Sequence, residues 1–335
     1  MPKGQLSMTH ANPYQGKREV MSKSEHVAVI GAGLMGHGIA QIFAAHGYTV
    51  MLMDVNEGLI GKAIGNIRSN LMLMAQNGIG HLEDIEPTLS RIRPTVDLKE
   101  AASEAQFVVE AVTENLKIKQ DIFKELDLIC PEETHLATNT SVISITEIAQ
   151  KAQKRHRIVG THFWNPPYLI PLVEVIRGKE TSKEVVEATF DLLRRVGKHP
   201  VKVNKDVPGF VGNRLQHALW REAISIVEQG IADPETIDEV VKNSFGIRLP
   251  VLGPLENADL VGLDLTLQIH DYILKHIGNS TEPSPLLRRK VEKGELGFKT
   301  GRGFQQWNPE SIDQCRKHLL NHLIHWNREH IEDWE

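Results

Sequence analysis

Residues 26–54 constrain the fold of this chain more than any other stretch. They read HVAVIGAGLMGHGIAQIFAAHGYTVMLMD. An apolar run stops at Gly31, two further glycines follow at Gly33 and Gly36, and a second apolar run closes on Asp54. This order predicts a strand, a tight glycine turn, a helix and a second strand, which is the βαβ unit that binds a dinucleotide.

Each glycine of the turn has a physical reason to lack a side chain. Gly31 permits the tight turn, Gly33 lets backbone amides approach the pyrophosphate, and Gly36 lets the helix pack closely on the strand. Leu34 and Met35 lie between the last two glycines and are expected to line the cofactor with them. The pyrophosphate would lie at the positive end of the helix dipole.

Asp54 indicates which dinucleotide the unit prefers. A carboxylate at the end of the second strand accepts hydrogen bonds from the adenosine ribose and repels a 2′-phosphate, so NAD is the expected cofactor. Glycine turns of this kind also occur without any ligand, but here the flanking strand, helix and acid all agree with nucleotide binding. No metal is expected, since Cys130 and Cys315 stand alone.

Length and composition limit the other possibilities. The chain has 335 residues, enough for two domains, and a formal net charge of −5, which gives no indication of a nucleic-acid or membrane partner. Its apolar stretches are too short to span a bilayer. Residues 1–24 are polar, contain three methionines and resemble no signal peptide, so a disordered leader is expected. The two unpaired cysteines favour a reducing, cytoplasmic location.

The segment from residue 25 to residue 205 alternates between helical and strand patterns. Helical patterns over 57–76 and 82–91 predict a hairpin inserted after the second strand. Later strands are expected at 106–112, 135–139, 157–162, 172–176 and 201–203, with helices at 116–129, 145–152 and 183–196. This rhythm predicts an α/β, Rossmann-type, doubly wound and mostly parallel sheet. The short link between 162 and 172 requires one antiparallel pair.

The segment from residue 206 to residue 335 reads as an all-α C-terminal domain. Helical patterns cover 210–229, 259–276, 285–293 and 309–330, and Asp233-Pro234 marks another helix start. Two domains are therefore expected, an NAD-binding domain at 25–205 and a helical domain at 206–335.

His162 is the candidate catalytic base. Ligands of open α/β sheets bind at the carboxyl ends of strands, and His162 ends a predicted strand opposite Glu174. An alcohol dehydrogenation needs a base for the hydroxyl proton, and histidine is the residue type that titrates near neutral pH. Glu174 would fix the tautomer of the ring and stabilise the imidazolium. A structural histidine at a strand end is the ordinary alternative.

Six motifs in order resemble the L-3-hydroxyacyl-CoA dehydrogenase family. They are GAGLMGHGIA, VVEAVTENLKIK, NTS at 139–141, HFWNPPYLIPLVEV at 162–175, KDVPGFVGNR at 205–214 and GFKTGRGF at 297–304. The resemblance covers nearly everything from His26 to about Trp307. It implies an NAD-dependent oxidoreductase that interconverts 3-hydroxy and 3-keto groups in fatty acid metabolism, and a homodimer formed by the helical domain.

The resemblance also implies roles for individual residues. His162 matches the base and Glu174 its partner, while Ser141 and Asn213 match groups that hydrogen-bond the reacting oxygen. The positions that match cofactor contacts are Glu114, Lys119, Ser141, Asn165 and Lys299. Helix capping, turn formation and plain surface exposure are the respective alternatives for Ser141, Asn165 and Lys299.

The sequence is compatible with two classes of substrate. Ile170-Pro171 stands where acyl-CoA members carry a lysine, and this segment resembles gulonate dehydrogenase, lambda-crystallin and carnitine dehydrogenases. Residues 69–80 of the hairpin contain no lysine or arginine, and Asn77 replaces an expected CoA-binding lysine. Arg68 is the candidate to supply the missing charge. A 3-hydroxyacyl-CoA and a small free 3-hydroxy acid are therefore both compatible with the sequence.

Two functions without turnover are alternatives to catalysis. Lambda-crystallin shows that this scaffold also serves as a structural protein, and a nucleotide sensor would need only the βαβ unit. The complete set of Ser141, His162, Glu174 and Asn213 favours an enzyme over a structural protein, because a structural role does not require all four. Absence of turnover on every 3-hydroxy substrate would favour the sensor.

Overall fold

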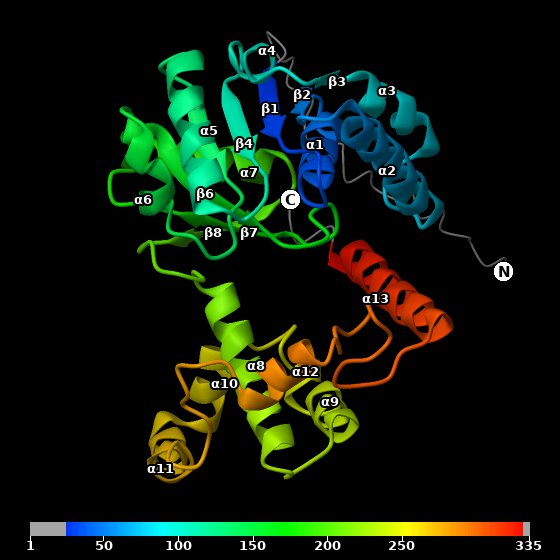
Figure 1. Cartoon of the computed structure of the whole chain (residues 1–335), viewed down its shortest axis with the longest axis vertical. Helices are drawn as coiled ribbons and strands as arrows, with labels where there is room; N and C mark the ends of the chain where they lie inside the picture. Colours follow the sequence, from blue (N-terminus) through cyan, green and yellow to red (C-terminus); the bar gives the residue numbers. More distant parts are fainter. Residues whose placement is uncertain (1–24, 331–335) are drawn as a thin grey trace, which may run out of the picture. The chain divides into compact units, whose positions relative to one another are not determined.

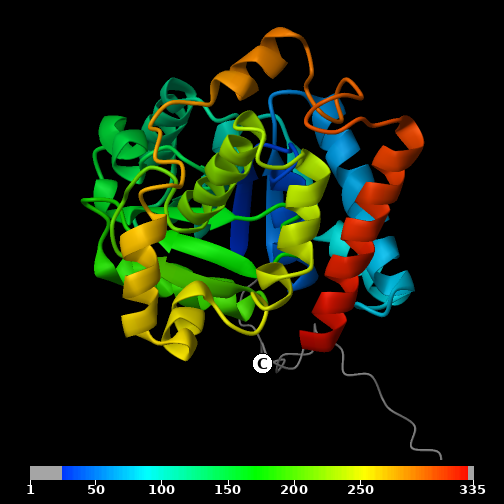
Figure 2. The same ribbon diagram turned by 90° about the horizontal axis from the view of Figure 1, so that it is seen from below.

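The computed structural model describes residues 25–330, so the predicted leader at residues 1–24 lies outside the described residues. The chain forms two compact units. Among the described residues, the first unit comprises 25–213 and 320–330, and the second is Arg214–Leu319. Figures 1 and 2 show the strands of the first unit side by side, with helices against the sheet.

The first unit is built on one sheet of eight strands in the order β3-β2-β1-β4-β5-β6-β7-β8. The strands are β1 (His26–Ile30), β2 (Thr49–Met53), β3 (Ile92–Thr95), β4 (Phe107–Glu110), β5 (His135–Thr138), β6 (Ile158–Phe163), β7 (Leu172–Ile176) and β8 (His199–Val203). Every neighbouring pair is parallel except β6 with β7. The predicted Rossmann-type sheet with one antiparallel pair is confirmed.

Two helical layers cover the two faces of the sheet, as Figure 1 shows for α1 and α2 against α5 and α6. One apolar cluster contains α1 (Gly36–Ala45), α2 (Glu57–Gln76), α3 (Ile85–Ser90) and α7 (Lys183–Arg195). The other contains α4 (Leu98–Ala102), α5 (Leu116–Ile129) and α6 (Ile145–Ile148). Alternate residues of each strand point into the two clusters, as a pleated sheet requires.

The predicted hairpin consists of α2, a 3₁₀ turn (Leu82–Asp84) and α3. Asn56 caps α2 by accepting a hydrogen bond of 2.7 Å from the Gly58 N–H. The apolar stripe of α2 is buried as its helical spacing predicts. The edge strand β3 and helix α4 were not predicted. The sequence Ile-Arg-Pro-Thr of β3 lacks a strand pattern, and a proline is tolerated there because the strand lies at an edge.

The second unit is helical apart from isolated bridges near Gly297 and Arg302. Its helices are α8 (Gly212–Glu228, which starts in the first unit), α9 (Pro234–Lys242), α10 (Pro254–Val261), α11 (Leu263–Ile273), α12 (Pro285–Glu292) and α13 (Pro309–His330, which ends in the first unit). The single helix predicted over 259–276 is wrong. Gly262 has φ +99° and separates α10 from α11, because that conformation cannot continue a right-handed helix.

The end of α13 packs on the first unit. Ile324 is buried against Met74, Ile79 and Leu169, and the Asn327 amide donates a hydrogen bond of 2.8 Å to the Leu169 carbonyl. The predicted limits of an NAD-binding domain at 25–205 and a helical domain at 206–335 stay a prediction.

Residues 25–330 contain neither a membrane-spanning helix nor a cluster of metal-binding side chains. None of the helices in this range is long and apolar enough to cross a membrane. Likewise, no three His, Cys, Asp or Glu side chains of this range are grouped to hold a metal ion.

Candidate functional site

The turn after β1 has the shape that a pyrophosphate needs. Gly31 has φ +103°, and a Cβ there would lie 2.7 Å from the Ala111 carbonyl oxygen. A Cβ on Gly36 would overlap the Gly31 carbonyl, so the helix can approach the strand only with glycine at that position. Gly33 has open space where its side chain would be. β1 and β4 flank the point where the strand order reverses, which is where open α/β sheets bind ligands.

Asp54 follows β2 and lies beside the same glycine turn. Its Oδ2 accepts a hydrogen bond of 2.8 Å from the Ala32 N–H, which ties the carboxylate to the glycine turn. Leu34 is 67% exposed, and Met35 occupies the N-cap position of α1. An open glycine, a helix N-terminus and a carboxylate at the ribose position together fit NAD.

His162 and Glu174 form a buried pair on the antiparallel strands. They lie directly opposite each other in the register of β6 and β7. His162 Nδ1 is 2.7 Å from Glu174 Oε2, and the two side chains are 5% and 1% exposed. With Nδ1 bonded to the carboxylate, Nε2 is the nitrogen left to act on a substrate.

The second oxygen of Glu174 binds the start of α8. Oε1 accepts hydrogen bonds from the N–H groups of Val211 (2.9 Å) and Gly212 (3.0 Å). Burial by itself raises the pKa of Glu174, but the hydrogen bonds from His162, Gly212 and Val211 outweigh it, and the pKa is lowered. Glu174 is therefore ionised beside the histidine.

Two aromatic rings flank the imidazole. The ring centroids of Trp164 and Phe210 lie 5.1 Å and 5.7 Å from that of His162. Phe210 is 1% exposed and has φ +48°, a left-handed conformation that is uncommon for a residue with a side chain.

Ser141 lies on the loop after β5 and is held from two sides. Its N–H donates to Glu114 Oε1 at 2.9 Å, and its carbonyl accepts a hydrogen bond of 2.9 Å from Asn213 Nδ2. The Thr140 hydroxyl also donates to Glu114. Burial by itself raises the pKa of Glu114. The opposite effect of the Thr140 hydrogen bond, the Lys119 charge and the backbone donors is larger, so the pKa is lowered overall. The structure thus brings the predicted residues Ser141, Asn213 and Glu114 together.

Lys119 is directed into the protein. Its ammonium lies 2.7 Å from Glu110 Oε1 and 3.5 Å from Glu114 Oε2, with no exposed side-chain surface. Glu110 also accepts hydrogen bonds from the Val112 N–H and the Thr138 hydroxyl. The predicted contact of Lys119 with the cofactor stays a prediction, because its charge is already paired in the described structure.

Three other predicted residues, Asn165, Lys299 and Arg68, make no described contact with the residues around His162 and Ser141. Asn165 is exposed and precedes Pro166 through a cis peptide bond. Lys299 is in an exposed turn of the second unit. Arg68 forms two hydrogen bonds to Glu86 of α3, so the residue expected to supply charge to the hairpin already has an acidic partner.

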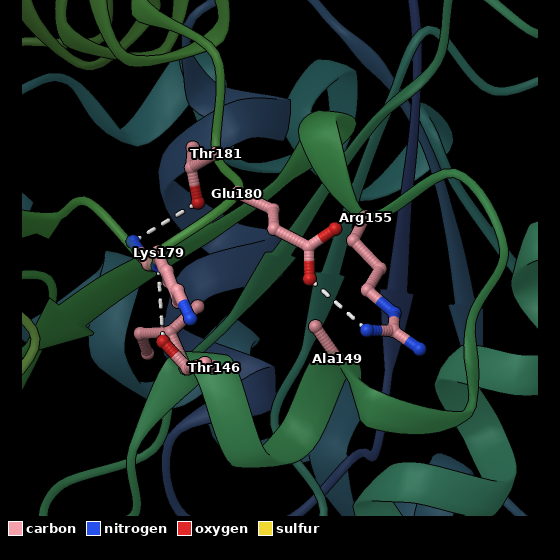
Figure 3. Close-up of a pocket in the computed structure, with 8 residues that line it drawn as sticks. Thr146, Ala149, Arg155, Lys179, Glu180 and Thr181 are labelled. Atoms are coloured by element: carbon pink, nitrogen blue, oxygen red, sulfur yellow. Dashed lines mark hydrogen bonds and ion pairs between the residues drawn. The ribbon is translucent and has the colours of Figure 1, made fainter.

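A small pocket beside α6 contains none of the predicted site residues. Thr146, Lys179 and Thr181 are among the residues that line it, and the ion pair of Arg155 with Glu180 borders it (Figure 3). The Lys179 N–H donates to the Thr146 hydroxyl at 3.0 Å.

Sequence reasoning missed three residues of this site. Trp164 and Phe210 lie inside the motifs at 162–175 and 205–214. The sequence did not indicate that their rings lie beside the imidazole of His162. Glu110 ends β4 as a buried acid, and an acid within an apolar strand is itself a signal of a pairing partner.

Two family models match the chain in succession. The model described as "3-hydroxyacyl-CoA dehydrogenase, NAD binding domain" matches residues 26–207. The model described as "3-hydroxyacyl-CoA dehydrogenase, C-terminal domain" matches residues 209–307. Together the matched ranges contain the glycine turn, the pair of His162 and Glu174, and the second unit as far as residue 307.

Individual proteins agree with these models. The probable 3-hydroxybutyryl-CoA dehydrogenase of Bacillus subtilis (strain 168) is 41% identical over 86% of this chain and 99% of its own length. The crystal structure of (S)-3-hydroxybutyryl-CoA dehydrogenase from Ralstonia eutropha matches with a TM-score of 0.72 and 36% sequence identity. The match covers 85% of this chain and 100% of that chain. The crystal structure of 5-formyl-3-hydroxy-2-methylpyridine 4-carboxylic acid 5-dehydrogenase matches with a TM-score of 0.84 and 33% sequence identity. The match covers 92% of this chain and 99% of that chain.

Proposed function

The chain belongs to the 3-hydroxyacyl-CoA dehydrogenase family of NAD-dependent oxidoreductases, and we propose that it oxidises the 3-hydroxyl group of a short 3-hydroxyacyl-CoA such as 3-hydroxybutyryl-CoA. The observation that carries this proposal is the buried pair of His162 and Glu174, 2.7 Å apart. A base held in one tautomer by a carboxylate is what removal of a hydroxyl proton requires.

The proton follows a defined route in this mechanism. His162 Nε2 takes the proton of the 3-hydroxyl group as the C3–O bond becomes a carbonyl. Glu174 accepts the hydrogen bond from Nδ1 throughout and stabilises the imidazolium that results. NAD held by the glycine turn and Asp54 would supply the acceptor for the hydride from C3. In the reverse direction His162 returns the proton to the oxygen.

Ser141 and Asn213 are proposed to orient the reacting oxygen. The Asn213 amide donates a hydrogen bond to the Ser141 carbonyl, so this amide lies beside the backbone that carries the Ser141 hydroxyl. A hydroxyl and an amide can each hydrogen-bond a developing oxyanion, which lowers the barrier. Glu114, Lys119, Asn165 and Lys299 are proposed to line the cofactor, as the resemblance implies.

A free 3-hydroxy acid is the alternative, and the comparisons do not favour it. The relatives named for 3-hydroxybutyryl-CoA align over nearly their whole length. The hairpin itself has no basic residue over 69–80, but the Arg328 guanidinium of α13 approaches Gly78 at its end. That arginine is a cation that sequence reasoning had not assigned to the hairpin.

A homodimer in the cytoplasm is also part of the proposal. From Arg214 to Leu319 no residue is buried within the chain. Large apolar side chains there are openly exposed, with Val251 at 81%, Leu255 at 80% and Tyr272 at 73%. Apolar surface of this extent supports association with a second copy, since monomers rarely leave it in water.

The test of the proposed reaction compares two esters of the same acid. NADH absorbance gives kcat/KM for 3-hydroxybutyryl-CoA and for the matching pantetheine thioester, each at low and high salt. We expect a large advantage for the CoA ester that shrinks with salt, because phosphate contacts at an exposed site are screened. Equal rates on both, with faster turnover of a free 3-hydroxy acid, would reject the acyl-CoA substrate.

The dyad is tested separately. His162→Gln should lower kcat by about 10²–10⁴-fold and leave NADH binding nearly intact. A near wild-type kcat in this variant would remove His162 from the mechanism whatever the substrate.

A further inference from the structure

The first turn of α8 is attached to the catalytic pair through Glu174. One carboxylate oxygen holds His162, and the other accepts the N–H groups of Val211 and Gly212. These N–H groups belong to the start of the helix, which has no intrahelical partners for them. Glu174 therefore satisfies the helix end and orients the imidazole at once.

Trp164 determines how closely that turn can approach. A Cβ on Gly212 would overlap Cζ2 of the Trp164 indole and lie 3.2 Å from its Cη2. The same indole lies 5.1 Å from the His162 ring. Glycine at 212 thus leaves room for a large ring that contacts both the imidazole and the helix start.

Hydrogen bonding does not explain why a tryptophan, and not a smaller aromatic residue, occupies position 164. Its Nε1 is buried, and none of the described residues accepts a hydrogen bond from it. A buried donor without a partner is unfavourable, so packing must justify the indole at this position. The packing partners are His162 and the Gly212 backbone.

The linker before α8 is fixed independently of the ring. Asp206 accepts four hydrogen bonds from the start of α6, from the Ser144 hydroxyl, the Ile145 N–H and both donors of Thr146. Figure 3 shows Thr146 at this end of α6 with the hydrogen bond from Lys179. The chain from 206 to 212 is therefore anchored at its beginning, and Trp164 decides where its end lies.

We propose that Gly212 and Trp164 are a matched pair of positioning residues, which keep the first-turn amides of α8 on Glu174 and thereby set the orientation of His162. The inference deepens the proposed function, since it concerns the same base. Neither residue touches the reacting atoms in this role. Phe210 is the second ring beside the imidazole, and its left-handed backbone lies just before the start of the helix.

The pair is tested by a double-variant cycle in the full-length enzyme with NAD and 3-hydroxybutyryl-CoA. Gly212→Ala pushes a methyl group into the indole and should lower kcat by about 10–100-fold, with KM for NAD within about twofold. Trp164→Phe removes the colliding atoms and should stay within about fivefold of wild type. The double variant should recover to the Trp164→Phe rate, because the added methyl group then has room.

Two further measurements separate positioning from general damage. Without its amide donors Glu174 holds a proton more tightly, so the acid limb of the kcat profile should move to higher pH in Gly212→Ala and return in the double variant. The downfield proton signal of His162 Nδ1, recorded without substrate, should change in parallel. This signal remains informative if 3-hydroxybutyryl-CoA is not turned over, so failure of the substrate proposal is distinguishable from failure of this one.

The control is Gly61→Ala in α2, where the added Cβ meets open space. It should leave kcat and the pH profile unchanged. A wild-type kcat in Gly212→Ala, or a double variant as slow as Gly212→Ala, would overturn the pairing. Thermal unfolding of each variant identifies a fold defect, and a Gly212→Ala protein that is unfolded but refolds in the double variant supports the steric match.

Discussion

Replacing Lys119 with methionine should destabilise the first unit strongly, although the two side chains have similar lengths. The ammonium lies 2.7 Å from Glu110 Oε1, and neither side chain has exposed surface. Without the cation, Glu110 keeps only two neutral donors, the Val112 N–H at 2.7 Å and the Thr138 hydroxyl at 2.6 Å. Leaving one partner of a buried ion pair unpaired costs about 3–5 kcal/mol.

A second variant separates the buried charge from the lost packing. Lys119→Met combined with Glu110→Gln removes both charges and keeps an amide oxygen for the Val112 N–H. It should recover most of the free energy of unfolding, since an apolar or neutral replacement of a whole buried pair is often close to neutral. For a unit of this size, the single variant should lower Tm by about 6–20 °C.

The assay is urea unfolding followed by fluorescence, with NADH binding measured on the folded proteins. If Lys119 only neutralises Glu110, the double variant binds NADH nearly as wild type does. If the cofactor contact predicted from the sequence exists, NADH binding stays weak after stability is restored. A single variant as stable as wild type, or a double variant no better than the single, would refute the reasoning about the buried charge.

Three further outcomes can be measured directly. Asp54→Asn keeps an acceptor but removes the charge, so NAD binding should weaken and the preference over NADP should narrow; equal wild-type kcat/KM with both cofactors would contradict this role. Burial lowers the pKa of His46 to about 4, so the unfolded chain takes up this proton near pH 6.5 and the folded chain only near 4, and stability falls as pH drops through that window. His46→Asn should reduce that acid-induced loss by about 2–3 kcal/mol in urea titrations at pH 7 and pH 4.5, and an unchanged loss would assign it to other groups. Asn327→Leu removes the hydrogen bond to the Leu169 carbonyl and should cost about 1–2 kcal/mol, whereas the exposed Asn321→Leu should change stability by under about 0.5 kcal/mol; equal effects would deny α13 an anchoring role.

The βαβ unit could be predicted because its signals are local. The glycines at 31, 33 and 36 and the acid at 54 are close in sequence, and the backbone conformations they permit depend on their immediate neighbours. The start of α2 follows in the same way from its Asn56 cap, and the course of the helix follows from its apolar periodicity. Gly262 shows the limit of this approach, since a glycine within a helical pattern can either continue the helix or interrupt it.

The pairing of His162 with Glu174 could also be predicted, because a short link forces adjacent strands to be antiparallel and sets their register. The sequence contains both residues and the constraint that joins them. It does not say that the second oxygen of Glu174 binds the start of α8, since Val211 and Gly212 are distant in the chain and their amides could have other acceptors.

Only the tertiary structure decides the contacts between distant segments. Although Lys119 and Glu110 are nine positions apart, they pair because the packing of β4 and α5 buries both side chains, and no periodic pattern encodes that choice. Asn327 meets Leu169 because α13 returns to the first unit, across 158 positions of sequence. Local propensities fix which residues share a face or a turn, whereas long-range contacts depend on how whole elements pack, and packing is a property of the assembled fold.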